Sequence, residues 1–479
     1  MSDDLKIKHV YLERMHGHQT SELELFPGLN IIYGKNGTGK TTLLHTIVNL
    51  LEMDLERFLY ITFNRITVTT YSGDTVSLVQ DISEVGDPRV TVFVNDKEVG
   101  ICKSEQPCPA SIIEVLKKIF WKRPVYLPAY RSMLEGATRR SSSYSRRVGP
   151  DFSEKEYNQI VERESDLLAE RRRNGPHYSR IIEREQVELI AFKTLTCRAW
   201  FGNFVPIVRY PSIAEVHDEL ESEIERARYV VAAQDEENIS TVFRRVLEVI
   251  LSEKETEIDQ DVGALIDRVR RAVTDLGPGS GDVPAVYGEI AEFLRSDHQY
   301  SDITSSVKIK GILKVYDDAL STRAEIKEKT YSGIDTFMRS VNKFLGESKS
   351  LVYEYREIPR RLKRGKLFVR LPDRKEIGLN RLSSGERHVL TLLFSATHMS
   401  PTDGLVTIDE PELSLHVDWQ RIILGEIGKQ AKDRQIIACT HSPEVAAEHL
   451  DAYIELTNIP ATQIQVPEGF EQTELDIEE

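Results

Sequence analysis

The sequence has few cysteines and no long hydrophobic run. Its longest apolar segments are short, such as residues 405–408, whereas a membrane-spanning helix needs about 20 apolar residues, so we expect no segment to cross a bilayer. The N-terminus, MSDDLKIKHVYLERMH, lacks the apolar stretch of a signal peptide. No CxxC pair or disulfide framework is expected among the four cysteines, Cys102, Cys108, Cys197 and Cys439. These absences predict a cytoplasmic protein of a reducing compartment, without a cysteine-based metal site.

Basic residues are outnumbered by acidic ones. The net charge of −15 argues against a protein that coats nucleic acid generally, although it leaves room for a local basic groove. Hydrophobic residues at 40% and charged residues at 29% describe an ordinary soluble protein. A chain of 479 residues forms either one large core with a big insertion or two to three domains.

The first 135 residues predict two kinds of sheet around a glycine-rich loop. Strands are expected at 21–26 and 29–33, and helical periodicity predicts a helix over 41–53. From 64 to 101 the pattern alternates with period two and contains turn signals, which predicts an inserted antiparallel sheet. Residues 123–131 predict another core strand.

Residues 136–350 are charge-rich and predict a helical insertion. Heptads are not sustained over the length that a long coiled coil needs, so we expect a compact helical insertion or arm rather than a long rod. Helical spacing is found at 153–173, 179–200, 212–254, 260–276 and 284–297.

After residue 350 the chain again predicts strands, at 351–355 and 366–371. Helices and strands then alternate, which is typical of a parallel α/β sheet. The acidic end of the chain is expected to be disordered. The alternating elements are predicted at 384–398, 405–408, 417–430 and 435–439, and the predicted domains are 1–135, 136–350, 351–460 and a tail at 461–479.

Residues 34–41 match the pattern G-x-x-x-x-G-K-[ST] and lie between a predicted strand and a predicted helix. The glycines let the backbone wrap around phosphates, and the helix N-terminus adds partial positive charge. Lys40 is expected to reach the β- and γ-phosphates of ATP, and the Thr41 hydroxyl to bind Mg²⁺. The alternative, a chance glycine-rich turn, is disfavoured by the flanking elements. The expected nucleotide contacts are Gly34, Lys35, Asn36, Gly37, Thr38, Gly39, Lys40, Thr41 and Thr42.

An acidic pair follows the apolar strand at 405–408. Asp409 is expected to be the second protein anchor of Mg²⁺, through water. Glu410 is placed to polarise a water molecule for in-line attack on the γ-phosphate. The alternative is that the two adjacent acids form a charge pair at the N-terminus of a helix. This alternative is less favoured because the glycine-rich loop occurs in the same chain.

Two further motifs flank the acidic pair. Residues 382–386, LSSGE, open a helix before it, and residues 439–443, CTHSP, follow the next strand. This order resembles the ABC ATPase superfamily, in particular the branch that contains SMC, RecF and the OLD-type ATPases. The segments DEPELSLHVDWQ and THSPE look especially like OLD-related ATPases, which are often found in anti-phage defence. The resemblance covers roughly 1–135 and 350–460, and implies an α/β P-loop NTPase with an ABC/SMC-like ATPase head, an antiparallel β-lobe and a large α-helical insertion.

In that family the signature motif of one subunit completes the ATP site of another. The resemblance therefore implies a homodimer or higher homo-oligomer with ATP at the subunit interfaces. By itself the motif is also a good helix N-cap with a glutamate in the first turn. His441 is expected to sense the γ-phosphate and to join Glu410 and Lys40 in catalysis, and His416 falls where the family places a dimer contact. The signature residues expected at the nucleotide are Ser383, Ser384, Gly385 and Glu386.

One position departs from the family pattern. ABC proteins usually place a glutamine on the loop that joins the two lobes, whereas this chain offers Tyr130 and Arg131. Arg131 is a candidate for contact with a phosphate or a partner lobe. Three basic clusters could contact nucleic-acid phosphates, with Tyr144 available for stacking on a base. The usual explanation of such clusters is a solvated helix face or a flexible loop, and docking of a partner protein is also compatible. The three clusters lie at 139–147 (Arg139, Arg140, Arg146 and Arg147), 171–173 and 360–366.

These features leave three roles open. The first is a sensor or regulatory ATPase of an anti-phage defence complex that uses ATP and Mg²⁺. The short stretch after His441 has no room for the Toprim nuclease domain of OLD proteins, so the nuclease or toxin effector is expected to be a separate polypeptide, as in Septu-type or PARIS-type systems. The second is a RecF- or SMC-like DNA repair or recombination ATPase. The third, a transporter ATPase, is disfavoured by the helical insertion and the missing glutamine. DNA or a phage component is a further compatible partner, and no membrane is expected.

Overall fold

The computed structural model describes residues 5–81, 87–104, 106–131, 134, 153–173, 180–251, 262–275, 307–356, 364–398, 404–431 and 433–457. The chain forms two compact units. The first unit comprises Met1–Ser212 and His388–Glu479, and the second comprises Ile213–Arg387. These boundaries do not coincide with those expected at 135 and 350.

A parallel sheet forms the centre of the first unit, with the strand order β14-β3-β13-β12-β8. Every neighbouring pair runs parallel. All residues of β12 and β13 are buried, as expected for strands that are covered on both faces. The core strands predicted at 29–33, 123–131, 405–408 and 435–439 are thereby confirmed, whereas the fifth strand of the sheet was not predicted. Their bounds are β3 (Leu29–Tyr33), β8 (Val125–Leu127), β12 (Val406–Asp409), β13 (Ile436–Thr440) and β14 (Tyr453–Glu455).

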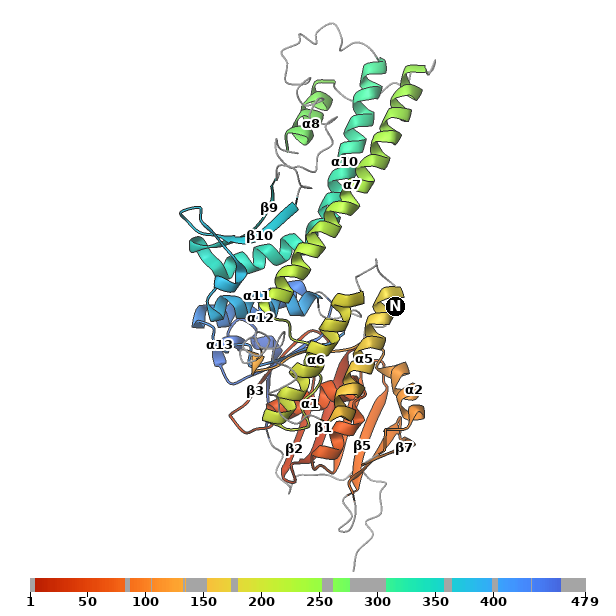
Figure 1. The fold of residues 1–479 in the computed structure, drawn as a ribbon, viewed down its shortest axis with the longest axis vertical. Helices are drawn as coiled ribbons and strands as arrows, with labels where there is room; N and C mark the ends of the chain where they lie inside the picture. Colours follow the sequence, from red (N-terminus) through yellow and green to blue (C-terminus); the bar gives the residue numbers. More distant parts are fainter. Residues whose placement is uncertain are drawn as a thin grey trace, which may run out of the picture. The chain divides into compact units, whose positions relative to one another are not determined.

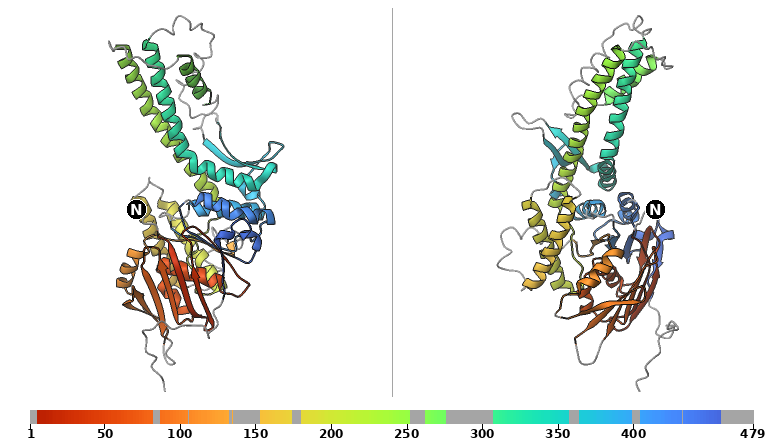
Figure 2. Two further views of the ribbon diagram at one scale, coloured as in Figure 1. Left: turned by 180° about the vertical axis from the view of Figure 1, so that it is seen from behind. Right: turned by 90° about the vertical axis from the view of Figure 1, so that its right-hand side faces the viewer.

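The second sheet of this unit is antiparallel, in the order β2-β1-β4-β5-β6-β7 (Figure 2). Buried and less buried residues alternate along β4, which confirms the predicted period of two. The turn between β6 and β7 has positive φ at both Asn95 (49°) and Asp96 (62°), two residue types that tolerate this conformation. The bounds are β1 (Ile7–Met15), β2 (Gln19–Glu24), β4 (Arg65–Thr70), β5 (Thr75–Asp81), β6 (Arg89–Val94) and β7 (Lys97–Lys103).

Helix α1 (Lys40–Leu51) is buried on nearly all faces. It contacts β12 and β13 of the parallel sheet, and its leucines share one hydrophobic core with the antiparallel sheet. A helix that is hydrophobic all round is stable only when it is enclosed in this way. The N-terminus of α1 is therefore held in place from both sides. The remaining elements of this unit are η1 (Leu55–Tyr60), α2 (Ala110–Ile119), α12 (Val417–Gln430), α13 (Pro443–Ala446), η5 (Leu450–Ala452) and the part of α11 (Ser384–His398) from His388 onward.

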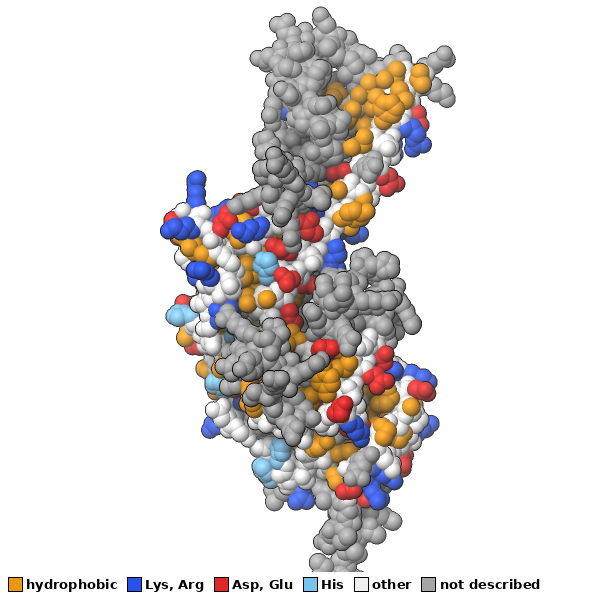
Figure 3. Space-filling model, viewed as in Figure 1, with side chains coloured by type: hydrophobic (Ala, Val, Ile, Leu, Met, Phe, Trp, Pro, Cys, Tyr) orange, Lys and Arg blue, Asp and Glu red, His pale blue; other side chains and the backbone are white. Residues whose placement is uncertain are grey.

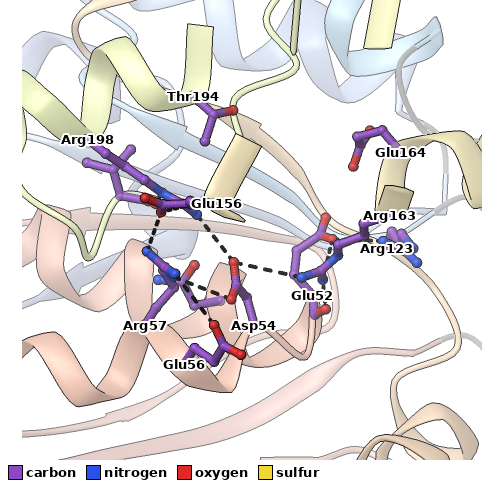
Figure 4. A network of polar contacts seen from close by, with 12 residues as sticks. Glu52, Asp54, Glu56, Arg57, Arg123, Glu156, Arg163, Glu164, Thr194 and Arg198 are labelled. Carbon is purple, nitrogen blue, oxygen red and sulfur yellow. Dashed lines mark hydrogen bonds and ion pairs between the residues drawn. The ribbon is translucent and has the colours of Figure 1, made fainter. Parts of the chain in front are cut away.

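A buried ionic network attaches α5 (Glu154–Arg173) and α6 (Arg180–Phe201) to the end of α1 (Figure 4). Glu52, the C-cap of α1, is 1% exposed and accepts hydrogen bonds from Arg123 (3.1 Å), Arg163 (3.2 Å) and Arg209 (2.6 Å). Burial alone would raise the pKa of Glu52, but the three arginines lower it by a larger amount. The net pKa lies below the usual value for a glutamate, so the carboxylate is charged. This network explains why residues 153–212, expected in the insertion, belong to the first unit.

The second unit contains a long helical hairpin of α7 (Ile213–Leu251) and α10 (Val307–Leu345), each of 39 residues (Figure 1). Val249 lies against Gly311 and Asp235 pairs with Arg323, so the helices run antiparallel. The sequence predicted α7 but not α10. A helical insertion or arm was expected, but two paired helices of this length were not.

The reason for this error lies in the seam between the two helices. Its buried positions recur at coiled-coil spacing, but some are polar. Asp235 and Arg323 are 2% and 4% exposed and form a bidentate pair at 2.7 and 2.9 Å. The pair interrupts the apolar pattern in the sequence while filling the seam in the structure. The buried apolar residues of the two helices include Leu220, Ile224, Ala227 and Val231 of α7, and Leu320, Ile334, Phe337, Val341 and Phe344 of α10.

A three-stranded antiparallel sheet, in the order β11-β10-β9, completes the second unit. Glu221 and Glu225 of α7 accept hydrogen bonds from the backbone N–H groups of Leu367 (3.0 Å) and Gly365 (3.2 Å), which ties the sheet to the hairpin. The helix α8 packs on α10. The bounds are α8 (Val262–Asp275), η3 (Gly346–Ser348), β9 (Ser350–Arg356), β10 (Arg364–Arg370), β11 (Glu376–Ile377) and η4 (Leu379–Arg381).

Two other expectations are affected. Cys102 and Cys108 form a disulfide bond, which corrects the expectation that no cysteines pair. The cysteines therefore no longer support a reducing compartment. Among the described residues no helix is both long and apolar enough to span a membrane. The helix expected at 284–297 and the tail at 461–479 lie outside the described residues.

The seam pair predicts unequal effects of single and double substitutions. Asp235→Ala leaves the Arg323 guanidinium buried without its partner carboxylate, and we expect a loss of about 3–5 kcal/mol in the free energy of unfolding. The double variant Asp235→Leu/Arg323→Met should lie within about 1 kcal/mol of the wild type or above it. Urea unfolding followed by circular dichroism measures both. As a control, Glu219→Ala removes an exposed ion pair with Arg226 and should lower the free energy of unfolding by less than about 1 kcal/mol. If Asp235→Ala lowered the free energy of unfolding by no more than this control does, the prediction would be contradicted.

Candidate active site

The glycine-rich loop connects the end of β3 to the start of α1, as predicted. Gly37 and Gly39 have φ of 82° and 88°, a conformation that favours glycine. A Cβ atom on Gly34 would lie 2.6 Å from the Thr38 Oγ1. Gly39 is the N-cap of α1, which has no side-chain cap and no acidic residue in its first turn. The loop thus presents the backbone N–H groups of a helix N-terminus to an anion.

Lys40 folds back over this loop. Its ammonium group donates to the carbonyls of Gly34 (2.6 Å) and Lys35 (3.0 Å), and the residue is 7% exposed. These carbonyls hold the positive charge beside the N–H groups that would receive a phosphate. An arriving phosphate oxygen therefore needs only to replace one local acceptor.

Thr41 and Asp409, the two predicted magnesium ligands, lie next to each other. The Thr41 hydroxyl donates to Asp409 Oδ2 at 2.9 Å. Asp409 is 1% exposed, and its Oδ1 atom is buried without a hydrogen-bond partner. Burial, aided by Glu410 and Glu412, raises the pKa of Asp409 to about 6, although Thr41 and Arg131 act in the opposite direction. A buried carboxylate oxygen without a partner, beside a hydroxyl, fits a hard cation such as Mg²⁺.

Glu410 follows directly, at the end of β12. Its φ is 49°, in the left-handed region, and its N–H donates to the Cys439 carbonyl at 2.8 Å. The carboxylate is partly exposed and lines a cleft together with Gly39, Lys40 and Thr41. A carboxylate at this place can accept a proton from a water molecule that attacks a phosphate in the cleft.

His441 lies immediately after β13, beside these acids. Its Nδ1 atom is 3.6 Å from Glu410 Oε1 and 3.2 Å from Glu412 Oε1. The imidazole is exposed, and its neighbour Glu410 lines the cleft. The structure therefore brings together Lys40, Glu410 and His441, the three residues predicted to be catalytic.

Glu412 is a residue whose position the sequence did not reveal. Its Oε1 atom accepts hydrogen bonds from the Thr440 hydroxyl (2.6 Å) and from the N–H groups of His441 (3.0 Å) and Ser442 (3.2 Å). This buried carboxylate joins the loop after β12 to the loop after β13. The available signal was the third acid of the DEPE motif.

The turn between β1 and β2 also reaches the glycine-rich loop. Gln19 donates from its side-chain amide to the Gly37 carbonyl at 2.8 Å, and His16 Nε2 is 3.2 Å from the Thr42 hydroxyl. Both residues line the cleft with Asn36. No sequence motif marks them, because their place at the site results from the pairing of β1 and β2.

The signature residues begin α11, as predicted. Glu386 accepts a hydrogen bond from the Ser383 N–H at 2.7 Å, and Ser383 Oγ accepts one from the Glu386 N–H at 3.3 Å. This is a capping box, so the alternative of a helix N-cap is confirmed. Lys349 donates to both Glu386 oxygens, at 2.8 and 2.9 Å. Ser383 and Ser384 are exposed and Gly385 is buried; their contact with a nucleotide stays a prediction.

Arg131 does not point to a cleft or a partner. It is 1% exposed and donates to the carbonyls of Pro128, Asp409 and Glu410, which corrects the expectation of a phosphate contact. His416 is exposed and caps α12, where its Nδ1 accepts from the Asp418 N–H at 3.4 Å. Its role at a dimer contact stays a prediction.

The basic clusters lie largely outside the described residues. This applies to 139–147 with Tyr144, to the side chains of 171–173, and to 360–364 apart from the backbone of Arg364. Lys366 is described and exposed, and lies 3.4 Å from a Glu376 carboxylate oxygen.

Known protein families match most of the chain. A family model described as "AAA domain" matches residues 9–260, which is more than half of the chain. The chain belongs to the AAA-domain family. A second model, described as "AAA domain, putative AbiEii toxin, Type IV TA system", matches residues 265–447 of this AAA-domain protein.

Among curated proteins, the AAA-domain protein is similar to the "Retron Ec83 probable ATPase" of Escherichia coli. The two are 28% identical over 224 residues, which cover 42% of this chain and 35% of the relative. The chain thus matches about a third of the relative's length. The glycine-rich loop, the acidic pair and the parallel sheet agree with the family, so the predicted P-loop ATPase fold is confirmed. The resemblance to OLD-type ATPases that the motifs predicted is confirmed at the level of AAA-family ATPases.

Solved structures give weaker likenesses. The Smc head domain of Pyrococcus furiosus, solved with an extended coiled coil and bound to the C-terminal domain of ScpA, matches with a TM-score of 0.35 and 12% identity, over 93% of this chain and 92% of that one. The Smc head domain of Pyrococcus yayanosii, with a coiled coil and joint, gives the same TM-score and identity over 95% and 97%. Likeness at this level carries no argument here.

The burial of Asp409 predicts that its carboxylate lowers the stability of the nucleotide-free protein while it supports metal binding. Because its pKa is raised to about 6 in the folded protein, the proton that it holds stabilises the fold below about pH 4, and this contribution is lost as the pH rises through 6. Asp409→Asn should therefore raise the stability of the nucleotide-free protein at pH 8, by at most about 3 kcal/mol, with a smaller gain at pH 5.

The same variant should lose the additional increase in melting temperature that Mg²⁺ gives in the presence of ATP. Differential scanning calorimetry at both pH values, with and without Mg²⁺, measures both effects. A variant that is less stable than the wild type at pH 8 would contradict the cost assigned to the buried charge.

Proposed function

We propose that this AAA-domain protein binds ATP with Mg²⁺ in the cleft beside α1 and hydrolyses it to ADP and phosphate. The observation that carries the proposal is the hydrogen bond from the hydroxyl of Thr41, at the start of the P-loop helix, to Asp409. The other carboxylate oxygen of Asp409 is buried without a hydrogen-bond partner. Residues 34–41 hold the triphosphate through backbone N–H groups, and Lys40 exchanges the Gly34 and Lys35 carbonyls for phosphate oxygens.

Thr41 and Asp409 would hold a Mg²⁺ ion, which when bound would neutralise charge on the phosphates. Glu410 accepts a proton from a water molecule as the water oxygen bonds to the γ-phosphorus and the bond to the bridging β,γ-oxygen breaks. His441, beside Glu410 and Glu412, donates a hydrogen bond to the γ-phosphate. Ser384 and Gly385 of a second copy supply the other side of the site, which makes the active form a homodimer or a higher homo-oligomer.

The wider role proposed is that of a regulatory subunit in an anti-phage defence complex, acting in the cytoplasm on a separate nuclease or toxin. The similarity to a retron ATPase and to a toxin-related AAA family supports it. Large hydrophobic side chains are exposed on α7, among them Tyr229 (77%), Phe243 (66%) and Leu251 (78%), and such a surface suits contact with another protein (Figure 3). A second candidate function is a RecF- or SMC-like ATPase that acts on DNA. The observation that supports this alternative is the long α7–α10 hairpin.

Removal of the P-loop lysine tests nucleotide binding. Charge-assisted hydrogen bonds contribute about 1.5–3 kcal/mol each, so Lys40→Ala should weaken ATP binding by roughly a hundredfold or more. Isothermal titration calorimetry with ATP and Mg²⁺ measures the affinity. Lys8→Ala, at an exposed position on β1, is the matched control and should bind as the wild type does. Unchanged affinity in Lys40→Ala would remove the P-loop assignment.

Neutralising Glu410 tests hydrolysis and assembly. Glu410→Gln should lower the ATPase rate by about 10²–10⁴-fold while ATP binding persists, because general bases contribute that much. With ATP and Mg²⁺ the variant should accumulate as a dimer or larger assembly in light-scattering chromatography, and should co-purify with a nuclease or toxin encoded beside it.

The exposed Glu448→Gln serves as the control for this experiment. Full turnover in Glu410→Gln would exclude its role as the base. If the trapped assembly binds duplex DNA in a salt-dependent way and no effector protein co-purifies with it, the result would favour the second candidate function.

A further inference from the structure

Arg131 is the largest side chain that is fully buried in the described part of the chain. Its guanidinium donates to the carbonyls of Pro128 (2.7 Å), Asp409 (2.7 Å) and Glu410 (2.6 Å), and its Nε–H donates to the ring of His388. A planar guanidinium directs its donors along fixed lines. Two of these donors hold the successive backbone carbonyls of the residues proposed to bind Mg²⁺ and to activate water.

The backbone that Arg131 holds is strained. Glu410 has a φ of 49°, which costs a residue with a side chain about 1–2 kcal/mol. Its N–H is bound to the Cys439 carbonyl on one side and its carbonyl to Arg131 on the other. Since both peptide groups that flank Glu410 are fixed, the direction in which its side chain leaves the backbone is fixed as well. Such strain persists only where the surroundings determine it.

His388 extends this arrangement to α11. It lies four residues after Ser384 and is 6% exposed. Burial, and then the charge of Arg131, lower the pKa of His388 well below its usual range, so the ring is neutral. A neutral ring has one acceptor and one donor: one nitrogen accepts from Arg131, and the other donates to the Leu413 backbone carbonyl, three residues beyond Glu410.

We propose that Arg131 and His388 are positioning residues for the Glu410 carboxylate, holding the backbone from Asp409 to Leu413 in the geometry that in-line hydrolysis needs. The inference rests on the proposed ATPase function and goes beyond it, because neither residue touches the nucleotide cleft. A general base displaced by about 1 Å loses roughly a hundredfold in rate. The pair therefore acts mainly on turnover, because the P-loop contacts that hold the triphosphate do not involve either residue.

The central test separates turnover from binding. Arg131→Lys keeps the charge but presents an ammonium group, which cannot match the planar set of acceptors. It should lower kcat by roughly 10–100-fold while the ATP dissociation constant changes by less than about threefold. Arg89→Lys, on an exposed position of β6, is the matched control. Steady-state ATPase assays and calorimetric titration of the full chain supply the two numbers.

Two substitutions of His388 make the test independent of how Arg131→Lys folds. A glutamine side chain has both an acceptor and a donor, so His388→Gln should keep kcat within about threefold of the wild type. His388→Leu can neither accept from Arg131 nor donate to Leu413, and should lower kcat as Arg131→Lys does. Equal rates in the two His388 variants, with equal ATP affinity, would overturn the proposal.

A double variant excludes a merely structural role. If Arg131 acts by placing the Glu410 carboxylate, then Arg131→Lys should have little further effect on the residual rate of Glu410→Gln, because residues that act as a unit are not additive. Independent, additive losses would overturn the proposal. Absence of ATP binding or hydrolysis in the wild type would instead refute the proposed function, whereas an active wild type with wild-type kcat in Arg131→Lys and His388→Leu refutes this inference alone.

Discussion

The parallel register of β3, β13 and β12 is the constraint on which the candidate site depends. Ala438 of β13 is paired with Ile31 of β3 on one side and with Ile408 of β12 on the other, so the three strands end at the same edge of the sheet. The loop at 34–39, the acidic pair and His441 all follow these ends, where parallel α/β sheets bind ligands. A ladder of backbone hydrogen bonds thus brings Thr41 within 2.9 Å of Asp409, although 368 positions separate them in the chain.

The loops beyond the strand ends are fixed by a second set of contacts, in which buried charged side chains hold backbone groups. Glu412 collects two N–H donors and one hydroxyl from the loop after β13, and Arg131 supplies donors to the carbonyls after β12. Burying a charge is costly unless its hydrogen bonds are made. Arg131 directs three of its bonds to backbone carbonyls and Glu412 Oε1 accepts two from backbone N–H groups, whereas Glu412 Oε2 is buried without a partner. The positions of the polar side chains at the site are therefore set through the backbone that carries them.

The sequence predicted the elements whose information is local. Period-two alternation, the glycine-rich loop and the LSSGE capping box each encode their structure within a few residues, and all three are found. The long helix α10, the Glu52 network and the role of Arg131 escaped because each depends on partners far along the chain. Arg323 in the coiled-coil seam looks like a surface residue until Asp235 is known to face it. Likewise, nothing in the sequence shows that Gln19 contacts Gly37, since the pairing of β1 and β2 places it there.

The proposed site contains two unfavourable features, and well-packed elements surround them. Asp409 is buried with one oxygen unpartnered, and Glu410 is held at a positive φ. Around them, α1 is enclosed by two sheets, and Glu52 at its far end is paired with three arginines. A cation between Asp409 and a bound triphosphate would relieve the first cost, so ligand binding and folding stability are linked at this point. We infer that the folded protein keeps an unfavourable arrangement because it is favourable only with the ligand present. A ligand shifts the conformational equilibrium of a protein only if it stabilises one state more than another, and relief of this cost would be such a difference.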